Sequence, residues 1–217
     1  MGTWYEKGIF YHMYPLGLTG APKHNDQTEV TDRMKELEEW IPHMRSLGCN
    51  SLYIGPLFES STHGYDTRDY KLVDRRLGDN DGFRHFVKAC HEAGIRVVVD
   101  GVFNHTGYDS RYFNGRGRYD SLGAHQSKDS PYCPWYEFSE WPDKYGSWWG
   151  IYTLPQVNES DGSYQDYIIE DEDSVVRRWL RLGASGWRLD VADELPDSFI
   201  RKLNAAARRE KSDALII

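Results

Sequence analysis

The stretch from which the fold can be worked out is Ile95-Arg-Val-Val-Val-Asp100-Gly-Val-Phe-Asn104-His105. Its first half is a β-branched run that follows Gly94, and such a run predicts a strand buried on both faces, as in a parallel sheet. Its second half carries a carboxylate, an amide and an imidazole: Asp100, Asn104 and His105. Because parallel sheets and barrels bind ligands at the carboxyl ends of their strands, these three residues are the first candidates for a functional site.

On both sides of this stretch, short apolar runs alternate with longer amphipathic segments, which is the pattern of βα units. Between 107 and about 166 the periodicity stops, and Gly, Ser, Asp, Asn and aromatic residues take over, which predicts an irregular insertion. We expect strands at 8–14, 51–54, 95–100, 186–190 and 214–217, and helices at 31–47, 82–93, 174–182 and 198–210.

This order of elements predicts an α/β fold, a partial (β/α)8 TIM barrel with strands 1 to 5 and an irregular inserted domain after strand 3. A complete barrel typically needs about 250 residues, so the chain is expected to be a fragment or to take its partner strands from another copy. The expected domains are barrel units 1–3 at 1–106, a B-type insertion at 107–165, and unit 4 with the start of unit 5 at 166–217. A doubly wound sheet ranks second, because no Gly-rich phosphate loop follows a strand.

Charge and hydropathy narrow the classes of partner. The 217 residues contain 26 Lys and Arg against 34 Asp and Glu, a net charge of −8, and no basic cluster, which argues against nucleic acid and anionic membranes as partners. No apolar run approaches the roughly 18 residues of a membrane span, and the start lacks the apolar core of a signal peptide. We therefore expect a cytoplasmic protein.

A second candidate site lies at the end of the fourth predicted strand. Strand alternation places Arg188 and Asp190 on the same face, two residues apart. A guanidinium keeps a neighbouring carboxylate ionised, as a nucleophilic or charge-stabilising carboxylate requires. Spacing alone favours a buried ion pair for Arg188 and Asp190. The corner from Asp100 to His105 is equally compatible with simple capping, so both structural readings stay open.

Four motifs, in this order along the chain, resemble the α-amylase family of glycoside hydrolases (glycoside hydrolase family 13). The Asp100–His105 and Gly186–Asp190 stretches resemble its first and second signatures. His63–Tyr70 resembles its sugar-stacking tyrosine segment, and Leu154–Asn158 resembles the motif at the end of its insertion. The acidic pair Asp193-Glu194 after the second signature resembles the cyclomaltodextrinase and neopullulanase-like branch.

The resemblance implies a (β/α)8 barrel that cleaves α-glucosidic bonds with retention, acting on maltooligosaccharides or other α-glucans. Asp190 would be the nucleophile and Arg188 would hold it ionised and oriented. Tyr65 would stack on the sugar, and His105 would hydrogen-bond one of its hydroxyls. The further residues implied are His63, Asp66 and Glu194 for substrate binding, and Asp100 and Asn104 for shaping the corner.

No cofactor is required by the resemblance, which leaves calcium open at Asn104. The loop 17–28, where some members of the family carry a second Asp-rich loop, holds only Asp26 as a carboxylate. Since a hard cation needs several oxygen ligands, we do not expect calcium there.

The chain departs from the family in one respect. The family's general acid is a glutamate just after strand five, and this chain ends at Ile217. We therefore expect an incomplete catalytic domain that is inactive alone, whose unpaired sheet edges favour self-association. The alternatives are a non-catalytic carbohydrate-binding or self-assembling half-barrel and, ranked lower, a metal-dependent hydrolase using Asp100, His105 and His63. Linkage, chain length and the choice between hydrolysis and transglycosylation are not encoded in the motifs.

Overall fold

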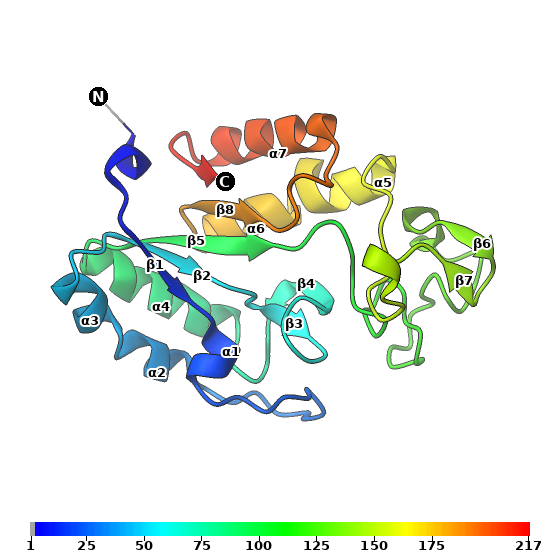
Figure 1. Ribbon diagram of the computed structural model, residues 1–217, viewed down its shortest axis with the longest axis horizontal. Helices are drawn as coiled ribbons and strands as arrows, with labels where there is room; N and C mark the ends of the chain where they lie inside the picture. The colour runs from blue at the N-terminus through cyan, green and yellow to red at the C-terminus, as the bar shows by residue number, and fades with distance from the viewer. Residues whose placement is uncertain (1–2) are drawn as a thin grey trace.

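A parallel sheet of five strands, in the order β1-β2-β5-β8-β9, forms the centre of the computed structural model, which describes residues 3–217. The order in space equals the order along the chain, as expected when each βα unit adds its strand beside the previous one. The ribbon in Figure 1 shows β2, β5 and β8 pointing toward the inserted segment. The strands are β1 (Phe10–Met13), β2 (Ser51–Ile54), β5 (Arg96–Gly101), β8 (Gly186–Leu189) and β9 (Leu215–Ile216).

The register of the sheet brings the predicted site residues together. Asp100 on β5 lies opposite Arg188 on β8, and Tyr53 on β2 lies opposite Val98 on β5. All five predicted strands are therefore present, with the central run at 95–100 buried as its β-branched composition predicted. The chain is a partial (β/α)8 barrel.

Three of the four predicted helices form as expected: α4 (Asn80–Glu92), α6 (Val175–Arg181) and α7 (Asp197–Glu210). The predicted helix at 31–47 is wrong as a single element, because the structure has two short helices, α2 (Met34–Glu38) and α3 (Ile41–Ser46). Pro42 in the first turn of α3 explains the break. It has no N–H to donate to the carbonyl of Glu38, and its ring would clash with that carbonyl in a continuous helix.

An antiparallel hairpin, β3 (Phe58–Ser60) with β4 (Thr67–Val73), was not predicted. It follows β2 and carries His63 and Tyr65 in the turn between its strands. The aromatic core joins this hairpin to the sheet: Phe58 lies 4.7 Å from Trp179 and 5.8 Å from Trp187, measured between ring centres. The turn is therefore held rigidly at the carboxyl ends of the strands.

The segment between β5 and α6 is mostly irregular. It is tied back to the strand end by isolated bridges, including one between His105 and Gln156, and Tyr164 anchors it by donating to the carbonyl of Phe103 at 2.7 Å. The remaining short elements of the chain are η1 (Trp4–Lys7), α1 (Pro15–Leu18), η2 (Cys133–Trp135), β6 (Phe138–Glu140), β7 (Lys144–Tyr145), η3 (Trp148–Gly150), α5 (Gly162–Gln165) and the π-helical turn η4 (Asp166–Glu170).

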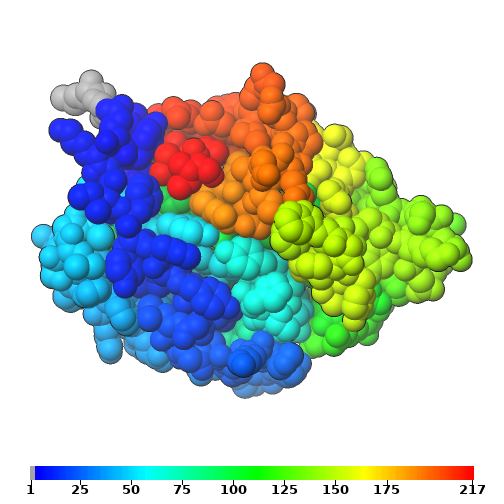
Figure 2. All heavy atoms as spheres, in the orientation of Figure 1, coloured from blue at the N-terminus to red at the C-terminus, as the bar shows by residue number. Residues whose placement is uncertain are grey.

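Exposed apolar side chains lie at the two outer strands of the sheet: Phe10 in β1, Ile9 just before it, and Ile217 just after β9. In the space-filling view of Figure 2 the blue N-terminal and red C-terminal segments meet on one face of the molecule. Within residues 3–217, no helix has the length and the apolar character needed to cross a membrane.

Candidate active site

A cavity of about 340 Å³ opens at the carboxyl ends of β5 and β8. Its wall is built by the β3–β4 turn, the corner after β5, the inserted segment and the turn after β8. These contribute His63, Tyr65, His105, Trp148, Ile151, Thr153, Leu154, Asp190 and Val191. Residues from all four sequence motifs thus meet around one space.

Asp190 is held by Arg188. The guanidinium Nη1 of Arg188 donates to Oδ1 of Asp190 at 2.6 Å and to Oδ1 of Asp100 at 3.0 Å. Asp190 keeps partial access to solvent and faces the cavity, whereas the side chain of Asp100 is fully buried. One cation therefore orients the exposed carboxylate while a second, buried carboxylate fixes the cation.

The buried carboxylate has a second partner. The hydroxyl of Tyr53 donates to Oδ2 of Asp100 at 2.6 Å. Burial raises the pKa of Asp100, and the bonds from Tyr53 and Arg188 act in the opposite direction because both stabilise the charged form. Burial and the neighbouring Asp100 charge raise the pKa of Tyr53, so its hydroxyl stays protonated and able to donate.

The backbone after Asp190 is strained. Val191 has φ of +44°, in the left-handed region that β-branched residues rarely adopt. The amide of Asp190 donates to the carbonyl of Gly101 at 3.0 Å, which continues the pairing of β8 with β5 up to this point. The sharp turn therefore follows the last paired residue and places both Asp190 and Val191 on the cavity wall.

His105 lies on the cavity wall. It is almost fully buried, and this burial lowers its pKa, an effect that the charge of Asp190 partly opposes. Its ring stacks on Trp148 with centres 5.3 Å apart, and Nδ1 lies 3.3 Å from Oδ1 of Asn104. Nε2 is buried and has no hydrogen-bond partner in the described part of the chain.

Tyr65 and His63 form the wall that comes from the hairpin turn. Tyr65 is half-buried and its pKa is raised, chiefly by burial. The side chain of His63 is 53% exposed, and its Nδ1 accepts from the amide of Tyr65 at 3.2 Å. Tyr65 and His63 thus face the same cavity, one as an aromatic ring and the other as a polar group. This combination suits a sugar, because a sugar ring has an apolar face and a rim of hydroxyls.

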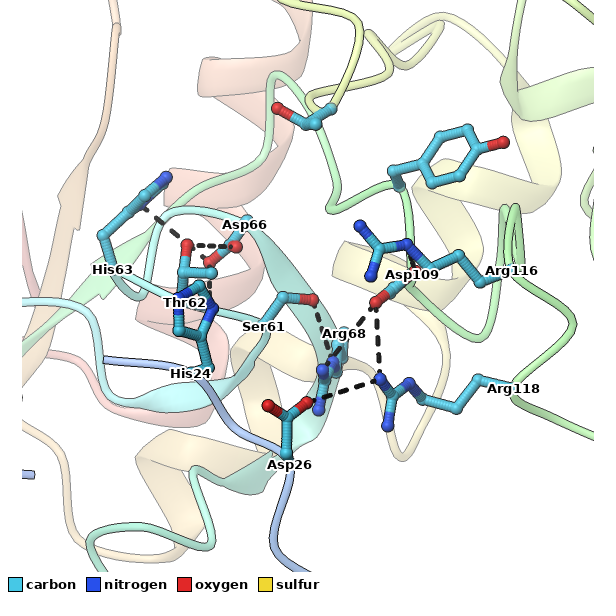
Figure 3. A pocket seen from close by; sticks show the side chains of 12 residues that line it. His24, Asp26, Ser61, Thr62, His63, Asp66, Arg68, Asp109, Arg116 and Arg118 are labelled. Atoms are coloured by element: carbon cyan, nitrogen blue, oxygen red, sulfur yellow. Dashed lines mark hydrogen bonds and ion pairs between the residues drawn. The ribbon is translucent and has the colours of Figure 1, made fainter. Parts of the chain in front are cut away.

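The structure does not bring Asp66 into this cavity, contrary to the sequence prediction. Its carboxylate accepts from the amide and the hydroxyl of Thr62, at 3.1 and 2.6 Å, and is almost completely buried. Figure 3 shows Asp66 directed at Thr62, beside a neighbouring pocket. Since both carboxylate oxygens stabilise the hairpin turn, Asp66 supports His63 and Tyr65 without facing the space beside Asp190.

That neighbouring pocket, of about 420 Å³, is dominated by charge. Figure 3 shows Arg68, Arg116 and Arg118 converging on Asp109, with nitrogen–oxygen distances of 3.8, 3.4 and 3.6 Å. Arg118 also lies 4.0 Å from Asp26 in the loop after α1. These contacts connect the inserted segment to the hairpin and to the N-terminal loop, so the arginines have partners within the fold.

Glu194 lies outside the cavity, on the exposed turn after Asp190. Its Oε1 accepts from the indole nitrogen of Trp149 at 2.8 Å, a contact between the inserted segment and the β8 turn that the sequence did not reveal. Figure 2 shows the yellow-green spheres of the inserted segment against the orange spheres of this turn.

The side chain of Asn104, the position at which the resemblance left calcium open, is held by contacts within the fold. Its side chain is fully buried, with Nδ2 lying 3.4 Å from Oε1 of Glu159 and Oδ1 facing His105. Within residues 3–217 there is no place where three His, Cys, Asp or Glu side chains gather as metal ligands. The donor set also disfavours the metal-dependent hydrolase, because both oxygens of Asp100 are already engaged by Tyr53 and Arg188.

Sequence reasoning did not predict Tyr53, which holds Asp100, or the cavity-lining residues Trp148, Ile151, Thr153 and Val191. Tyr53 sits on a strand whose register was unknown, so nothing in the sequence placed its hydroxyl on Asp100. Trp148 belongs to a run of aromatic residues too crowded for one to be singled out. The strained turn at Val191 has no composition signal, because glycine is the residue that normally marks a positive φ.

Comparison with known proteins agrees with this geometry. The family model described as the alpha amylase catalytic domain matches residues 24–214. The chain is 37% identical to an amylopullulanase of Thermoanaerobacter thermohydrosulfuricus over 93% of its own length and 15% of the relative's. It is 30% identical to a cyclomaltodextrinase of Thermoanaerobacter pseudethanolicus over 99% of its length and 39% of the relative's.

Among solved structures, the maltose complex of cyclic α-maltosyl-(1→6)-maltose hydrolase from Arthrobacter globiformis aligns with a TM-score of 0.84 and 28% identity. The alignment covers 99% of this chain and 51% of that one, so the chain spans about half of the solved relative and less than half of the curated relatives above. The expected likeness to the cyclomaltodextrinase branch is confirmed. By its fold, its four motifs and the family match, the chain belongs to the α-amylase family of glycoside hydrolases.

Proposed function

We propose that this chain provides the nucleophile side of a retaining α-glycosidase site that acts on α-glucan oligosaccharides. The observation that carries the proposal is the position of Asp190. It lies on the wall of a cavity that fits a sugar ring, bonded to Arg188 at 2.6 Å, with Tyr65 and His105 lining the same space. This arrangement supplies a charged nucleophile, an apolar plate and a hydrogen-bonding group.

In the proposed reaction, a carboxylate oxygen of Asp190 attacks the anomeric carbon of the bound glucosyl unit. The bond from that carbon to the leaving oxygen breaks, and a glycosyl ester of Asp190 forms, which water later hydrolyses with net retention. Arg188 holds the carboxylate in one orientation before attack, and Asp100 and Tyr53 hold Arg188. His105, whose Nε2 has no hydrogen-bond partner among the described residues, would bond a hydroxyl of the reacting sugar.

The leaving oxygen must also receive a proton, since an alkoxide is a poor leaving group. Retaining enzymes place the acid about 5–5.5 Å from the nucleophile. Asp190 is the one carboxylate among the described residues that line the cavity. We therefore place the general acid outside these 217 residues, and propose that the chain by itself does not cleave an unactivated glucan.

The proposed substrates are α-linked glucose oligomers. The relatives reported above include a cyclomaltodextrinase and a hydrolase of cyclic maltosyl-maltose, which supports this class.

The test uses a leaving group that needs no acid. Fluoride departs without protonation, so the chain should release fluoride from α-maltosyl fluoride and leave maltotriose intact. Asp190→Asn should abolish fluoride release, whereas Asp193→Asn, a change of the same type at an exposed position on the same turn, should not. Cleavage of maltotriose would overturn the placement of the acid, and fluoride release surviving in Asp190→Asn would overturn the role of Asp190.

The lack of a second lining carboxylate also favours one alternative, a carbohydrate-binding module without catalysis. It predicts maltotriose binding by calorimetry together with no fluoride release from the wild-type chain. The fluoride assay therefore separates the two functions directly.

A further inference from the structure

Trp149 is the most solvent-exposed of the large apolar side chains in the described part of the chain, at 79%. It sits in η3 at the rim of the cavity, next to Trp148, which lines it. Two further exposed residues, Ile151 in the cavity wall and Tyr152 at 65% exposure, lie beside it in the sequence. Exposed apolar side chains thus lie in the same short segment as Trp148, which lines the cavity that holds Asp190.

The indole of Trp149 is fixed despite its exposure. Its nitrogen donates to Oε1 of Glu194 at 2.8 Å, and its ring stacks on Trp148 with centres 5.3 Å apart and planes 24° from parallel. Trp148 in turn stacks on His105, also at 5.3 Å. Trp148 therefore covers one face of the indole of Trp149, and the solvent-exposed area lies on the rest of the ring.

The backbone at this position is strained as well. Trp149 has φ of +51° and ψ of +28°, a left-handed conformation that is unfavourable for a bulky residue. The exposed ring of Trp149 is not part of the buried core, so core packing does not explain the strained backbone. Such features persist where surrounding contacts hold them, and they cluster at ligand clamps.

We propose that Trp149 is the platform of a second sugar subsite, which binds a glucosyl unit of the α-glucan outside the cavity that contains Asp190. The inference rests on the proposed function. The C–H face of a glucose ring packs on the free face of the indole, as sugar rings do on aromatic side chains. Oε2 of Glu194 takes no part in the bond to Trp149 and accepts from a sugar hydroxyl.

This subsite differs from the cavity in what it recognises. A single glucose unit fills the space beside Tyr65 and His105 and leaves Trp149 uncovered, whereas a longer chain reaches both. The subsite therefore gives chain-length preference to a site whose cavity alone does not discriminate by length.

The test compares ligands of different length in the Asp190→Asn background, where no turnover occurs. Calorimetry would measure binding of methyl α-glucoside and maltotriose to this protein and to versions that also carry Trp149→Ala, Trp149→Phe or Glu194→Ala. We expect Trp149→Ala to weaken maltotriose binding about tenfold, the loss of one stacking contact, with methyl α-glucoside unchanged. Trp149→Phe should retain most of the affinity, and Glu194→Ala should weaken only maltotriose.

Indole fluorescence provides an independent readout. Maltotriose should change the emission of the protein and methyl α-glucoside much less. That difference should disappear in Trp149→Phe and persist in Trp141→Phe, whose indole lies elsewhere in the inserted segment and donates to the carbonyl of Ala124.

The outcomes separate failure of this inference from failure of the proposed function. Equal losses for both ligands in Trp149→Ala would mean that the residue only shapes the cavity, and no loss for either would mean that the exposed indole serves something other than a sugar. Both results overturn the subsite while leaving the cavity as a sugar site. Absence of methyl α-glucoside and maltotriose binding before Trp149 is changed would overturn the proposed function itself, and the subsite with it.

Discussion

The hydroxyl of Tyr53 donates to Oδ2 of Asp100 at 2.6 Å, while Arg188 donates to the other oxygen, so the buried carboxylate has a partner on each side. Tyr53 also stacks on His12, with ring centres 4.4 Å apart and planes 10° from parallel. Strands β1, β2, β5 and β8 are thereby connected to Asp190 through contacts between side chains alone.

Tyr53→Phe is expected to destabilise the fold. Removing the hydroxyl leaves Oδ2 of a buried carboxylate without its donor, at a cost of about 1–3 kcal/mol in the free energy of unfolding. Urea denaturation would measure it. Tyr11→Phe is the matched control, since it removes the same hydroxyl from a half-buried tyrosine on the neighbouring strand β1. Equal losses in the two variants would contradict the assigned role of the bond.

Arg188→Met should cost about 3 kcal/mol of unfolding free energy, because it leaves the carboxylate of Asp100 buried without its cation. Adding Asp100→Asn should recover a large part of that loss, and a double-mutant cycle from denaturation curves would measure the coupling. Arg201→Met, at an exposed ion pair with Asp197, should have a much smaller effect. Additive losses at Arg188 and Asp100 would rule out the coupling.

Glu159 should make stability depend on pH. Burial raises its pKa to about 7 from an ordinary value of 4.5, so the folded chain keeps this proton where the unfolded chain has released it. Between about pH 4.5 and 7 the folded state binds more protons, and the free energy of unfolding therefore falls as pH rises through this window.

Glu159→Gln should remove this dependence. The variant is expected to be more stable than the wild type at pH 8, on the order of 2 kcal/mol, and nearly equal to it at pH 4. Denaturation at a series of pH values would measure this difference. Glu137→Gln, an exposed glutamate lining the same small pocket, serves as the control and should not change the slope. A Glu159→Gln variant with the wild-type pH slope would refute the prediction.

The outer strands are expected to drive self-association, as the sequence suggested. Apolar side chains at Ile9 and Phe10 are exposed on the β1 edge, where backbone groups are open to pairing with another strand. Light scattering after size exclusion should give a mass that rises with concentration for the 217-residue chain. Ile9→Lys should lower that mass, and Leu122→Lys, at an exposed site in the inserted segment, should not. A stable monomer would overturn this expectation.

Much of the site was predictable because it depends on local order along the chain. The run 95–100 is β-branched and ends in polar residues, which sufficed to predict a buried strand and its functional end. Arg188 and Asp190 lie on one face because strand alternation requires it, and the structure joins them at 2.6 Å. The partial barrel followed from the repeated βα pattern, which failed to predict the break in the helix at Pro42 and the β3–β4 hairpin.

What the sequence by itself determined was the set of strands, their order and the residues at their ends, because hydrophobic periodicity and turn residues act over a few positions. Tertiary structure decided which side chains bond to one another. Register set Tyr53 against Asp100, hairpin geometry turned Asp66 toward Thr62, and the path of the inserted segment carried Trp149 to Glu194, 45 positions away. These contacts form only when segments that are distant in sequence pack together. The local pattern of one segment does not reveal which other segment it will contact.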